Sequence, residues 1–522
     1  MRSPAVDAAR PGLSARFPQV GRGSAFLAVA MLAAWAALVA YGLVHHVYWR
    51  DEVRALTLAL QAPSLIAVPS WVHGEGHPAL WYMLLRAAHD VADTRLVLPA
   101  VGLTAAALGI VLFVWKAPFP LWWKALFVFS GLSVYEYSVM ARNYGICMPI
   151  MFAIAIFITC RPRIYWALAV LLFLLPQTNV GAAMMAPLYV LILLAGWRDE
   201  RSGRDRIGIL VCAVAALVGL GCSFATLYPP RHDMVSESVG HVSLLNAVIQ
   251  AVVDPGARYD ALVHLFLPKT FSGPFATILL YGSALALLPD LALFASALLA
   301  LWGTAAFYSL VYPLVGYRHA GLVVVFMLSL YWIRYSGSAF RARQGTPLYR
   351  LQWIGAALFT FLLVMNVLFA FLLVSREGRQ ESSLSRAIGH MIAADPTLGR
   401  AILLPEPEEV GEALAYYTDN DMYLAREGKY GKAATWSSHE AKQAMSLGEL
   451  LAIAEKLKQD TGRPVLILIG PHLTGVGGVF HVAYAWQFSY TPAEFADLNT
   501  RATQLPLARD AADENFDVYL LK

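Results

Sequence analysis

Long apolar segments without charged side chains constrain the fold of this chain more than any other feature of its sequence. They contain one charged residue in all, Lys124. A charge at the centre of a membrane helix costs roughly 2.5–3.5 kcal/mol on insertion scales, so charge-free runs are typical of membrane spans. A span needs about 20 apolar residues. We therefore predict eleven transmembrane helices, at residues 24–44, 96–115, 121–135, 144–160, 164–176, 180–196, 207–227, 274–288, 291–311, 320–333 and 351–374.

The overall composition agrees with a membrane protein and excludes several other classes. Of the 522 residues, 58% are hydrophobic and 14% are charged, against about 25% charged residues in typical soluble domains. The net charge of +4 is small and the basic residues are scattered, so no nucleic-acid binding is expected. The four cysteines show neither metal-ligand nor disulfide spacing. The first apolar run is too long for a signal peptide, and we expect it to remain as a helix.

Lys and Arg residues are distributed unevenly between the loops, and this predicts the orientation of the chain. With the N-terminus inside, the inner segments between spans hold 16 Lys and Arg residues in 64 positions, and the outer segments hold 9 in 118. Cytoplasmic loops are enriched in Lys and Arg, so the N-terminus is predicted to be cytoplasmic. An odd number of spans then places the chain after Val374 outside. The C-terminal part would then lie on the outer side of the membrane.

The composition changes after the last apolar run, and residues 375–522 are predicted to form a soluble domain. Strands alternating with helices indicate a small α/β fold. The predicted fold class is thus a polytopic α-helical membrane domain, residues 1–374, followed by this α/β domain. Its expected strands are residues 401–404, 464–469 and 517–521. Its expected amphipathic helices are residues 408–417 and 447–458.

An acidic pair, Asp51–Glu52, follows directly after the first predicted span, in the outer loop 45–95. Two adjacent carboxylates can act as a general base and as a partner that orients a substrate or a metal ion. The alternative is an ordinary helix N-terminus, where acidic side chains interact favourably with the helix dipole. The spacing alone leaves both interpretations open.

A second polar element in the same outer loop carries His73, Glu75 and His77 at alternate positions. Such an arrangement binds a metal when the chain is extended, but the glycines between these residues favour a tight loop. The aromatic residues that follow are also typical of a helix anchored at the membrane interface. A metal site is therefore one of two interpretations here.

Two further polar elements are predicted at outer ends of spans. Glu136 and Arg142 flank the turn that precedes Tyr144 and the fourth span. They either pair with each other or face a reaction cavity. Arg318 and His319 stand at the outer end of the tenth span. They either bind an anionic lipid headgroup or a phosphate, because Arg offers a planar fork of donors, or simply extend to the headgroup layer as interfacial side chains commonly do.

The outer loop 228–273 is long, and loops of this length are usually functional. It contributes Arg231 and Lys269 as further cations. It has no Asp-x-Asp element, since Asp254 and Asp260 are separated by five residues.

The order of these elements resembles that of GT-C fold glycosyltransferases, specifically the protein O-mannosyltransferase and aminoarabinose transferase superfamily. The resemblance is carried by YWRDEVRAL after the first span, GHPALWYMLLRAAH further along the same loop, and EYSVMARNYG at the end of the third span. The superfamily has an acidic pair, a His-Pro-Pro element and an Ala-Arg-x-Tyr element in this order. Ala79 stands here in place of the second proline. The motifs cover residues 24–160, and the span count with the soluble tail extends the resemblance to the architecture.

The resemblance implies an inverting transfer of a sugar from a polyprenyl-phosphate carrier to an acceptor hydroxyl at the outer face. The acceptor would be a glycolipid, lipid A or a protein, and the location would be a bacterial inner (plasma) membrane, with a periplasmic C-terminal part. Asp51 would be the general base, Glu52 would orient the acceptor or a cation, and His77 would shape the acceptor pocket. Stabilisation of the phosphate leaving group would then be the main task of the remaining site residues. The candidates for that task are Arg142, Arg318 and His319, with Arg231 and Lys269 in reserve.

A metal cofactor does not follow from the resemblance. Some GT-C enzymes use a divalent cation, whereas the mannosyltransferase branch shows no general need for one. No metal ligands are predicted, and a divalent cation as cofactor stays open.

Two other functions compete with glycosyl transfer. A transporter usually places ionisable residues inside the membrane, whereas here they gather at one face. If the chain were instead a non-catalytic envelope-assembly protein with the tail as a binding module, the motifs would be coincidental. A different lipid-phosphate-dependent transferase is a further alternative.

Overall fold

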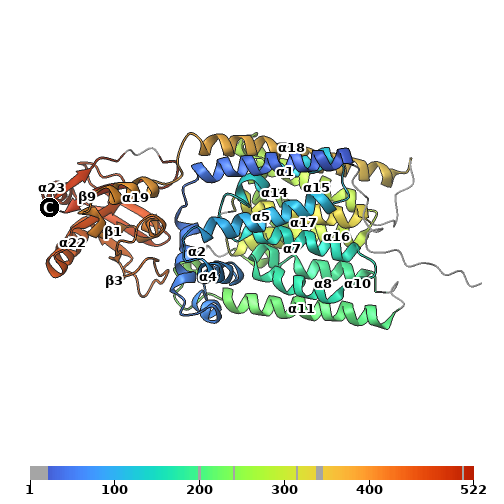
Figure 1. Cartoon of the computed structure of the whole chain (residues 1–522), viewed down its shortest axis with the longest axis horizontal. Coiled ribbons are helices and arrows are strands. Elements are labelled where there is room, and N and C mark those ends of the chain that lie inside the picture. Colours follow the sequence, from blue (N-terminus) through green and yellow to red (C-terminus); the bar gives the residue numbers. More distant parts are fainter. Residues whose placement is uncertain are drawn as a thin grey trace, which may run out of the picture.

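The structure is a computed structural model in which most of the chain is helical. Figure 1 shows a bundle of helices and, at one end of it, a smaller part built of strands and helices. Residues 1–21 and 337–344, which belong to the predicted inner segments, lie outside the described residues. The structure describes residues 22–197, 202–238, 242–312, 315–336, 345–507 and 511–521.

Seven helices of the described residues are long and apolar enough to cross a membrane, which makes this a multi-pass membrane protein. The long helices α1 and α18 run side by side along one edge of the bundle (Figure 1). Helix α17 runs through the interior, since every side chain from Ala320 to Trp332 is buried. The seven are α1 (Arg22–His45), α5 (Val97–Lys116), α11 (Gly203–Leu227), α15 (Lys269–Ala284) with its extension to Leu287, α16 (Leu291–Leu310), α17 (Tyr317–Ser336) and α18 (Pro347–Glu377).

The other four predicted spans form shorter helices, so the predicted count of eleven is not confirmed. The 16 residues of α7 extend only ~24 Å at 1.5 Å per residue, less than the ~30 Å of a hydrocarbon core. The third predicted span breaks where a π-helical turn, Leu132–Glu136, follows α6. The short helices are α6 (Leu121–Val128), α7 (Tyr144–Thr159), α8 (Tyr165–Leu174), and α9 (Val180–Ala183) with α10 (Ala186–Ala195).

The two predicted outer loops contain short helices rather than irregular chain. Helices α2 and α4 pack against each other at the end of the bundle that faces the strand-containing part (Figure 1). Both are amphipathic and bury one face. The helices of the first loop are α2 (Arg50–Gln61), α3 (Val68–Trp71) and α4 (Leu80–Val91), and those of the second are α12 (Met234–Ser238), α13 (Leu244–Val253) and α14 (Gly256–Tyr259).

The predicted strand-containing C-terminal part is present, and it is built around a four-stranded sheet of order β1-β5-β9-β8. Strands β1 and β5 are parallel, and β9 is antiparallel to both β5 and β8. Helix α22 packs on one face of this sheet and α19 on the other. The elements are α19 (Ser385–Ala394), β1 (Ile402–Glu406), α22 (Leu447–Thr461), β5 (Val465–Ile469), α23 (Pro492–Arg501), β8 (Ala502–Leu505) and β9 (Asp517–Leu521).

A smaller sheet of order β4-β7-β6 and a two-stranded ribbon complete this part. The predicted helix over residues 408–417 is divided into two single-turn helices, and the small sheet and the ribbon were not predicted. Alternation of buried and exposed residues is weak in β6, which is why its pattern does not stand out in the sequence. The elements are α20 (Glu408–Gly411), α21 (Leu414–Tyr417), β2 (Tyr423–Leu424), β3 (Lys429–Tyr430), β4 (Ala444–Ser446), β6 (Gly478–Ala483) and β7 (Trp486–Tyr490).

Candidate active site

Asp51 lies in the first turn of α2, where the helix bundle meets the C-terminal part (Figure 1). The chain leaves α1, passes through four residues and enters α2 with two acidic residues in its first turn. Acidic side chains are favourable there because the N-terminus of a helix carries partial positive charge. The Asp51 side chain keeps 41% of its surface exposed, so the carboxylate can be reached by a substrate.

Three arginines place positive charge around the Asp51 carboxylate. Arg142 forms an ion pair with Asp51, and Nε of Arg50 lies 3.9 Å from Oδ1 of Asp51. Burial of the surroundings opposes ionisation of Asp51, but the charges of Arg142, Arg318 and Arg50 outweigh it. They hold the pKa of Asp51 well below its usual range. Asp51 is therefore a carboxylate at neutral pH, as a general base must be.

Arg142 also connects Asp51 to His77. Its Nη2 donates a hydrogen bond to Nε2 of His77 at 3.1 Å. Burial and the charge of Arg142 lower the pKa of His77 to about 3, so the imidazole is neutral and carries its proton on Nδ1. This Nδ1 is buried and has no hydrogen-bond partner among the described residues. His77 thus offers a donor that a bound substrate oxygen can satisfy.

Arg318 has no carboxylate partner among the residues that the structure describes. Its guanidinium carbon lies 5.3 Å from the centre of the Trp49 ring, and its Nη1 lies 4.0 Å from Sδ of Met140. An arginine held by an aromatic ring keeps its planar set of donors available for a phosphate. Arg318 and Arg142 therefore form a pair of cations beside Asp51.

Tyr144 and His319 lie next to these cations. The Tyr144 ring centre is 5.2 Å from that of His319 and 6.2 Å from that of His77, both in edge contacts. The guanidinium carbon of Arg142 lies 6.0 Å from the Tyr144 ring centre. The backbone N–H of Gly316 donates to Nδ1 of His319 at 3.0 Å, which leaves Nε2 of His319 to contact a ligand. The predicted residues from three separate segments thus adjoin one another.

Glu52 does not lie where a substrate-binding residue would. It is 0% exposed, and its carboxylate accepts hydrogen bonds from the backbone N–H groups of Ala141, at 2.6 Å, and Trp49, at 3.3 Å. The interpretation that Glu52 contacts the acceptor or a metal ion does not agree with this position. The side chain is turned into the protein because its oxygens satisfy buried donors that no other described group reaches.

Glu136 is also buried, and one of its oxygens has no hydrogen-bond partner among the described residues. The pairing of Glu136 with Arg142, one of the two predicted alternatives, is not formed, because Arg142 pairs with Asp51. Arg231 and Lys269 are exposed. Within the described chain, neither forms a hydrogen bond or an ion pair with the residues around Asp51, so the structure does not bring them into the site.

The sequence gives no direct sign of the contacts that the C-terminal part makes with α2. Arg54 donates to both oxygens of Glu75, at 2.8 Å each, and to Glu412 at 2.6 Å. Arg50 lies 3.9 Å from Glu409. Residues 54 and 412 are separated by 358 positions, so no local pattern links them. The one available signal was the density of glutamates at positions 406–412, which is unusual for a buried segment.

No metal site is found in the described part of the chain, where no three His, Cys, Asp or Glu side chains are grouped closely enough to bind one ion. Two of the three candidate metal ligands His73, Glu75 and His77 have other partners: Glu75 forms an ion pair with Arg54, and His77 accepts a hydrogen bond from Arg142. The loop that carries them is a series of turns, in which Gly74 and Gly76 both have positive φ.

Comparison with known proteins finds similarity to solved structures alone. No family model and no curated protein matches the chain. The crystal structure of ArnT from Cupriavidus metallidurans in the apo state is 13% identical, with a TM-score of 0.47, over 95% of this chain and 98% of that one. The structure of the same protein bound to undecaprenyl phosphate is 14% identical, with a TM-score of 0.49, over 96% and 98%.

Proposed function

We propose that this protein is a membrane glycosyltransferase that moves a sugar from a polyprenyl-phosphate donor to an acceptor hydroxyl, with inversion at the anomeric carbon. The observation that carries the proposal is an accessible carboxylate, Asp51, that is paired with Arg142 and also feels the positive charge of Arg318. An acceptor hydroxyl needs a base, and a phosphate leaving group needs positive charge. Both requirements meet at one point of the surface where the bundle joins the C-terminal part.

In the proposed reaction, Asp51 takes the proton of the acceptor hydroxyl as its oxygen attacks the anomeric carbon. The new carbon–oxygen bond forms on the face opposite the phosphate, while the bond from the anomeric carbon to the phosphate oxygen breaks with its electron pair. The polyprenyl phosphate leaves with one more negative charge, and the proton stays on Asp51 until solvent removes it. Arg142 and Arg318 stabilise the developing charge, and His77 donates to a sugar or acceptor oxygen.

The resting ion pair between Asp51 and Arg142 has a consequence for this chemistry. A carboxylate whose pKa is held low is a weak base. A donor phosphate that engages Arg142 draws positive charge away from Asp51, and the pKa of Asp51 then rises towards the ordinary range of a carboxylic acid. Donor binding therefore prepares the base, and the acceptor is activated only when the donor is present.

We further propose the arrangement in the membrane that the loop charges favour. The N-terminus is cytoplasmic, residues 375–522 are a periplasmic domain, and residues 1–374 are the catalytic membrane domain, in a bacterial inner membrane. The acceptor is a lipid or a protein at the outer face. A reporter fused after Lys522 tests this orientation, and activity of a reporter that works only in the cytoplasm would contradict it.

Replacement of Asp51 by Asn is the direct test of the function. The purified full chain is incubated with an extract of polyprenyl-phosphate sugars and envelope acceptors, and release of polyprenyl phosphate is measured. Asp51→Asn should abolish release without reducing expression or membrane insertion. Asp93→Asn, an exposed position in the same loop, is the matched control and should release it like wild type. Full activity of Asp51→Asn would rule out Asp51 as the base, and no release by wild type would rule out the function.

A further inference from the structure

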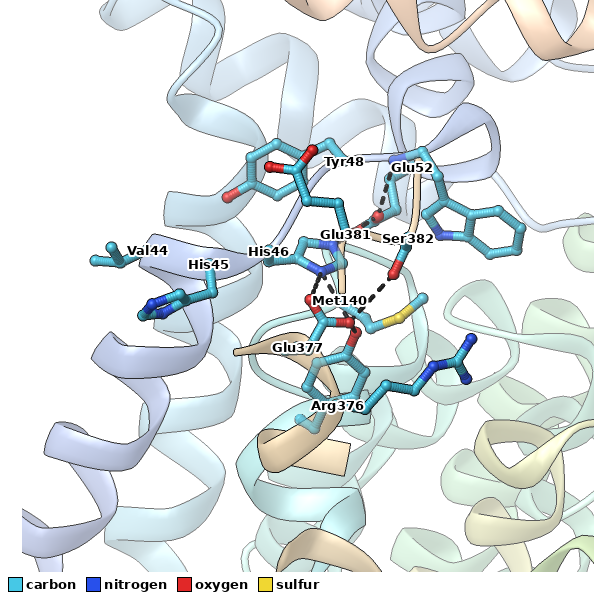
Figure 2. A network of polar contacts seen from close by, with 12 residues as sticks. Val44, His45, His46, Tyr48, Glu52, Met140, Arg376, Glu377, Glu381 and Ser382 are labelled. Atoms are coloured by element: carbon cyan, nitrogen blue, oxygen red, sulfur yellow. Dashed lines mark hydrogen bonds and ion pairs between the residues drawn. The ribbon is translucent and has the colours of Figure 1, made fainter. Parts of the chain in front are cut away.

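A buried polar network lies beside the Asp51–Arg142 pair, and His46 is at its centre (Figure 2). His46 is 3% exposed. Its Nε2 lies 2.9 and 3.2 Å from the two oxygens of Glu52, and its Nδ1 lies 3.5 Å from Oε2 of Glu377. Figure 2 shows the imidazole between the two carboxylates, which come from α2 and from the end of α18.

His46 is a cation in this position. Burial alone would lower the pKa of His46, but the negative charges of Glu52 and Glu377 and their hydrogen bonds raise it to about 10. Both ring nitrogens therefore carry protons: Nε2 donates to Glu52, and Nδ1 is in ion-pair contact with Glu377. Without this charge, two carboxylates would be enclosed together with no described cation between them, which is strongly unfavourable in a buried site.

On one side of His46, the network continues through Glu52 to the residues next to the Asp51–Arg142 pair. Glu52 follows Asp51 directly in the chain, and its Oε1 accepts from the backbone N–H of Ala141 at 2.6 Å. Ala141 directly precedes Arg142. One carboxylate thus fixes the backbone on both sides of the Asp51–Arg142 ion pair, although these segments are about 90 residues apart in the sequence.

The Glu377 arm ties the same centre to the end of the last membrane helix. Glu377 is the final residue of α18, and it accepts hydrogen bonds from Tyr135, in the π-helical turn, and from Ser382 at 3.2 Å. Tyr135 and Ala141 belong to the same irregular segment between α6 and α7. The segment that carries Arg142 is therefore held at two points, and both points connect to His46.

We propose that His46 is a positioning residue of the transfer reaction: without touching substrate, it holds Glu52 and Glu377 and so fixes the separation of Asp51 and Arg142. The inference rests on the proposed function and adds to it a residue outside the site. A group-transfer site tolerates little displacement, since a shift of about 1 Å can reduce the rate by as much as 100-fold. The structural alternative is that His46 contributes to folding alone.

The test compares kcat, KM for the donor and the thermal midpoint of purified full-chain variants. His46→Gln keeps a hydrogen-bonding side chain and removes the charge. It should lower kcat at least tenfold and change KM by less than threefold, because Arg318, the proposed phosphate-binding residue, is unchanged. The double variant His46→Gln/Glu52→Gln restores a neutral hydrogen-bonded pair and should recover part of kcat. Tyr189→Phe removes a buried hydrogen bond to Ser329 in the bundle and serves as the matched control for stability.

A loss of kcat in His46→Gln beyond that of Tyr189→Phe at the same thermal midpoint supports the proposal. Wild-type kcat in His46→Gln, or a loss that simply follows the midpoint in both variants, overturns it. If His46→Gln does not fold, Glu377→Gln decides: a lower kcat at an unchanged midpoint supports the proposal, and wild-type kcat overturns it. If wild type transfers no sugar and Asp51→Asn changes nothing, the proposed function has failed; if only His46→Gln behaves as wild type, this inference has failed alone.

Discussion

Replacing Asp51 by Asn should have opposite effects on transfer and on phosphate binding. In the resting protein Arg142 is engaged by the Asp51 carboxylate and by Nε2 of His77. A phosphate that enters must compete with Asp51 for Arg142, and it is repelled by the charge of Asp51. Asn has the same shape and no charge, so both penalties disappear together with the base. The variant should bind a lipid phosphate more tightly and transfer nothing.

The size of the gain follows from the exposure of the ion pair. The Arg142 side chain is 10% exposed and that of Asp51 is 41% exposed, so the pair is neither enclosed nor fully solvated. Exposed pairs contribute about 0.2–1 kcal/mol, and hydrogen bonds to charged groups contribute about 1.5–3 kcal/mol. We take ~1 kcal/mol for this half-exposed pair. Because about 1.4 kcal/mol corresponds to a tenfold change in affinity, Kd should fall roughly fivefold.

The measurement is equilibrium binding of undecaprenyl phosphate to the purified full chain in lipid nanodiscs, followed by the fluorescence of the intrinsic tryptophans. The same preparations are assayed for transfer, with Asp93→Asn as the control. A Kd for Asp51→Asn that equals or exceeds that of wild type would refute the competition between Asp51 and phosphate for Arg142. High salt should shrink the difference, because the competing interactions are electrostatic and partly exposed.

Three further predictions concern the surroundings of the site. Arg318→Ala should raise KM for the donor more than KM for the acceptor, because Arg318 forms no ion pair with a described residue; equal increases would contradict its role. Arg54→Met leaves the buried Glu412, which is 1% exposed, without its cation, so backbone amides of the C-terminal part should exchange hydrogen faster. Arg86→Met removes an ion pair within α4 and should leave these exchange rates unchanged. Burial raises the pKa of Glu409 to about 8, above that of an unfolded glutamate. The folded protein therefore retains a proton that the unfolded chain releases, and its stability should fall as pH rises from about 4.5 to 8. Glu409→Gln should make the thermal midpoint depend less on pH over this range, and an unchanged pH dependence would contradict the prediction.

Local patterns predicted the parts of the fold that depend on local interactions. Charge-free apolar runs located a helix at each predicted span, and short apolar runs located β1, β5 and β9. The acidic residues after α1 and the Arg-Asn-Tyr element before α7 were recognised as site candidates, and they lie together. In each case the signal is contained in one continuous stretch of the sequence.

Features that depend on distant partners could not be predicted in this way. Glu52 is buried because it contacts His46 and the backbone of the 136–143 turn. The sequence pattern of two adjacent carboxylates instead predicts that both Asp51 and Glu52 are exposed. The contact of Arg54 with Glu412 joins two parts of the chain that differ in composition. The predicted count of eleven spans is not confirmed for a different reason, since four of the apolar runs, each of 13–17 residues, form helices that are shorter than a full hydrocarbon layer is thick.

In the proposed membrane arrangement, the short helix α7 sets the depth of the site relative to the lipid. Its last residue, Thr159, is followed by Arg161 and Arg163, which suit a headgroup layer, and its first residue, Tyr144, adjoins the site. A helix of ~24 Å in a layer of ~30 Å leaves its far end ~6 Å below the opposite hydrocarbon surface. The bilayer must thin at this point, or the lipid phosphate must descend to meet Arg142. Hydrophobic mismatch of this kind has a modest energetic cost per ångström, so bilayers of shorter acyl chains should favour turnover.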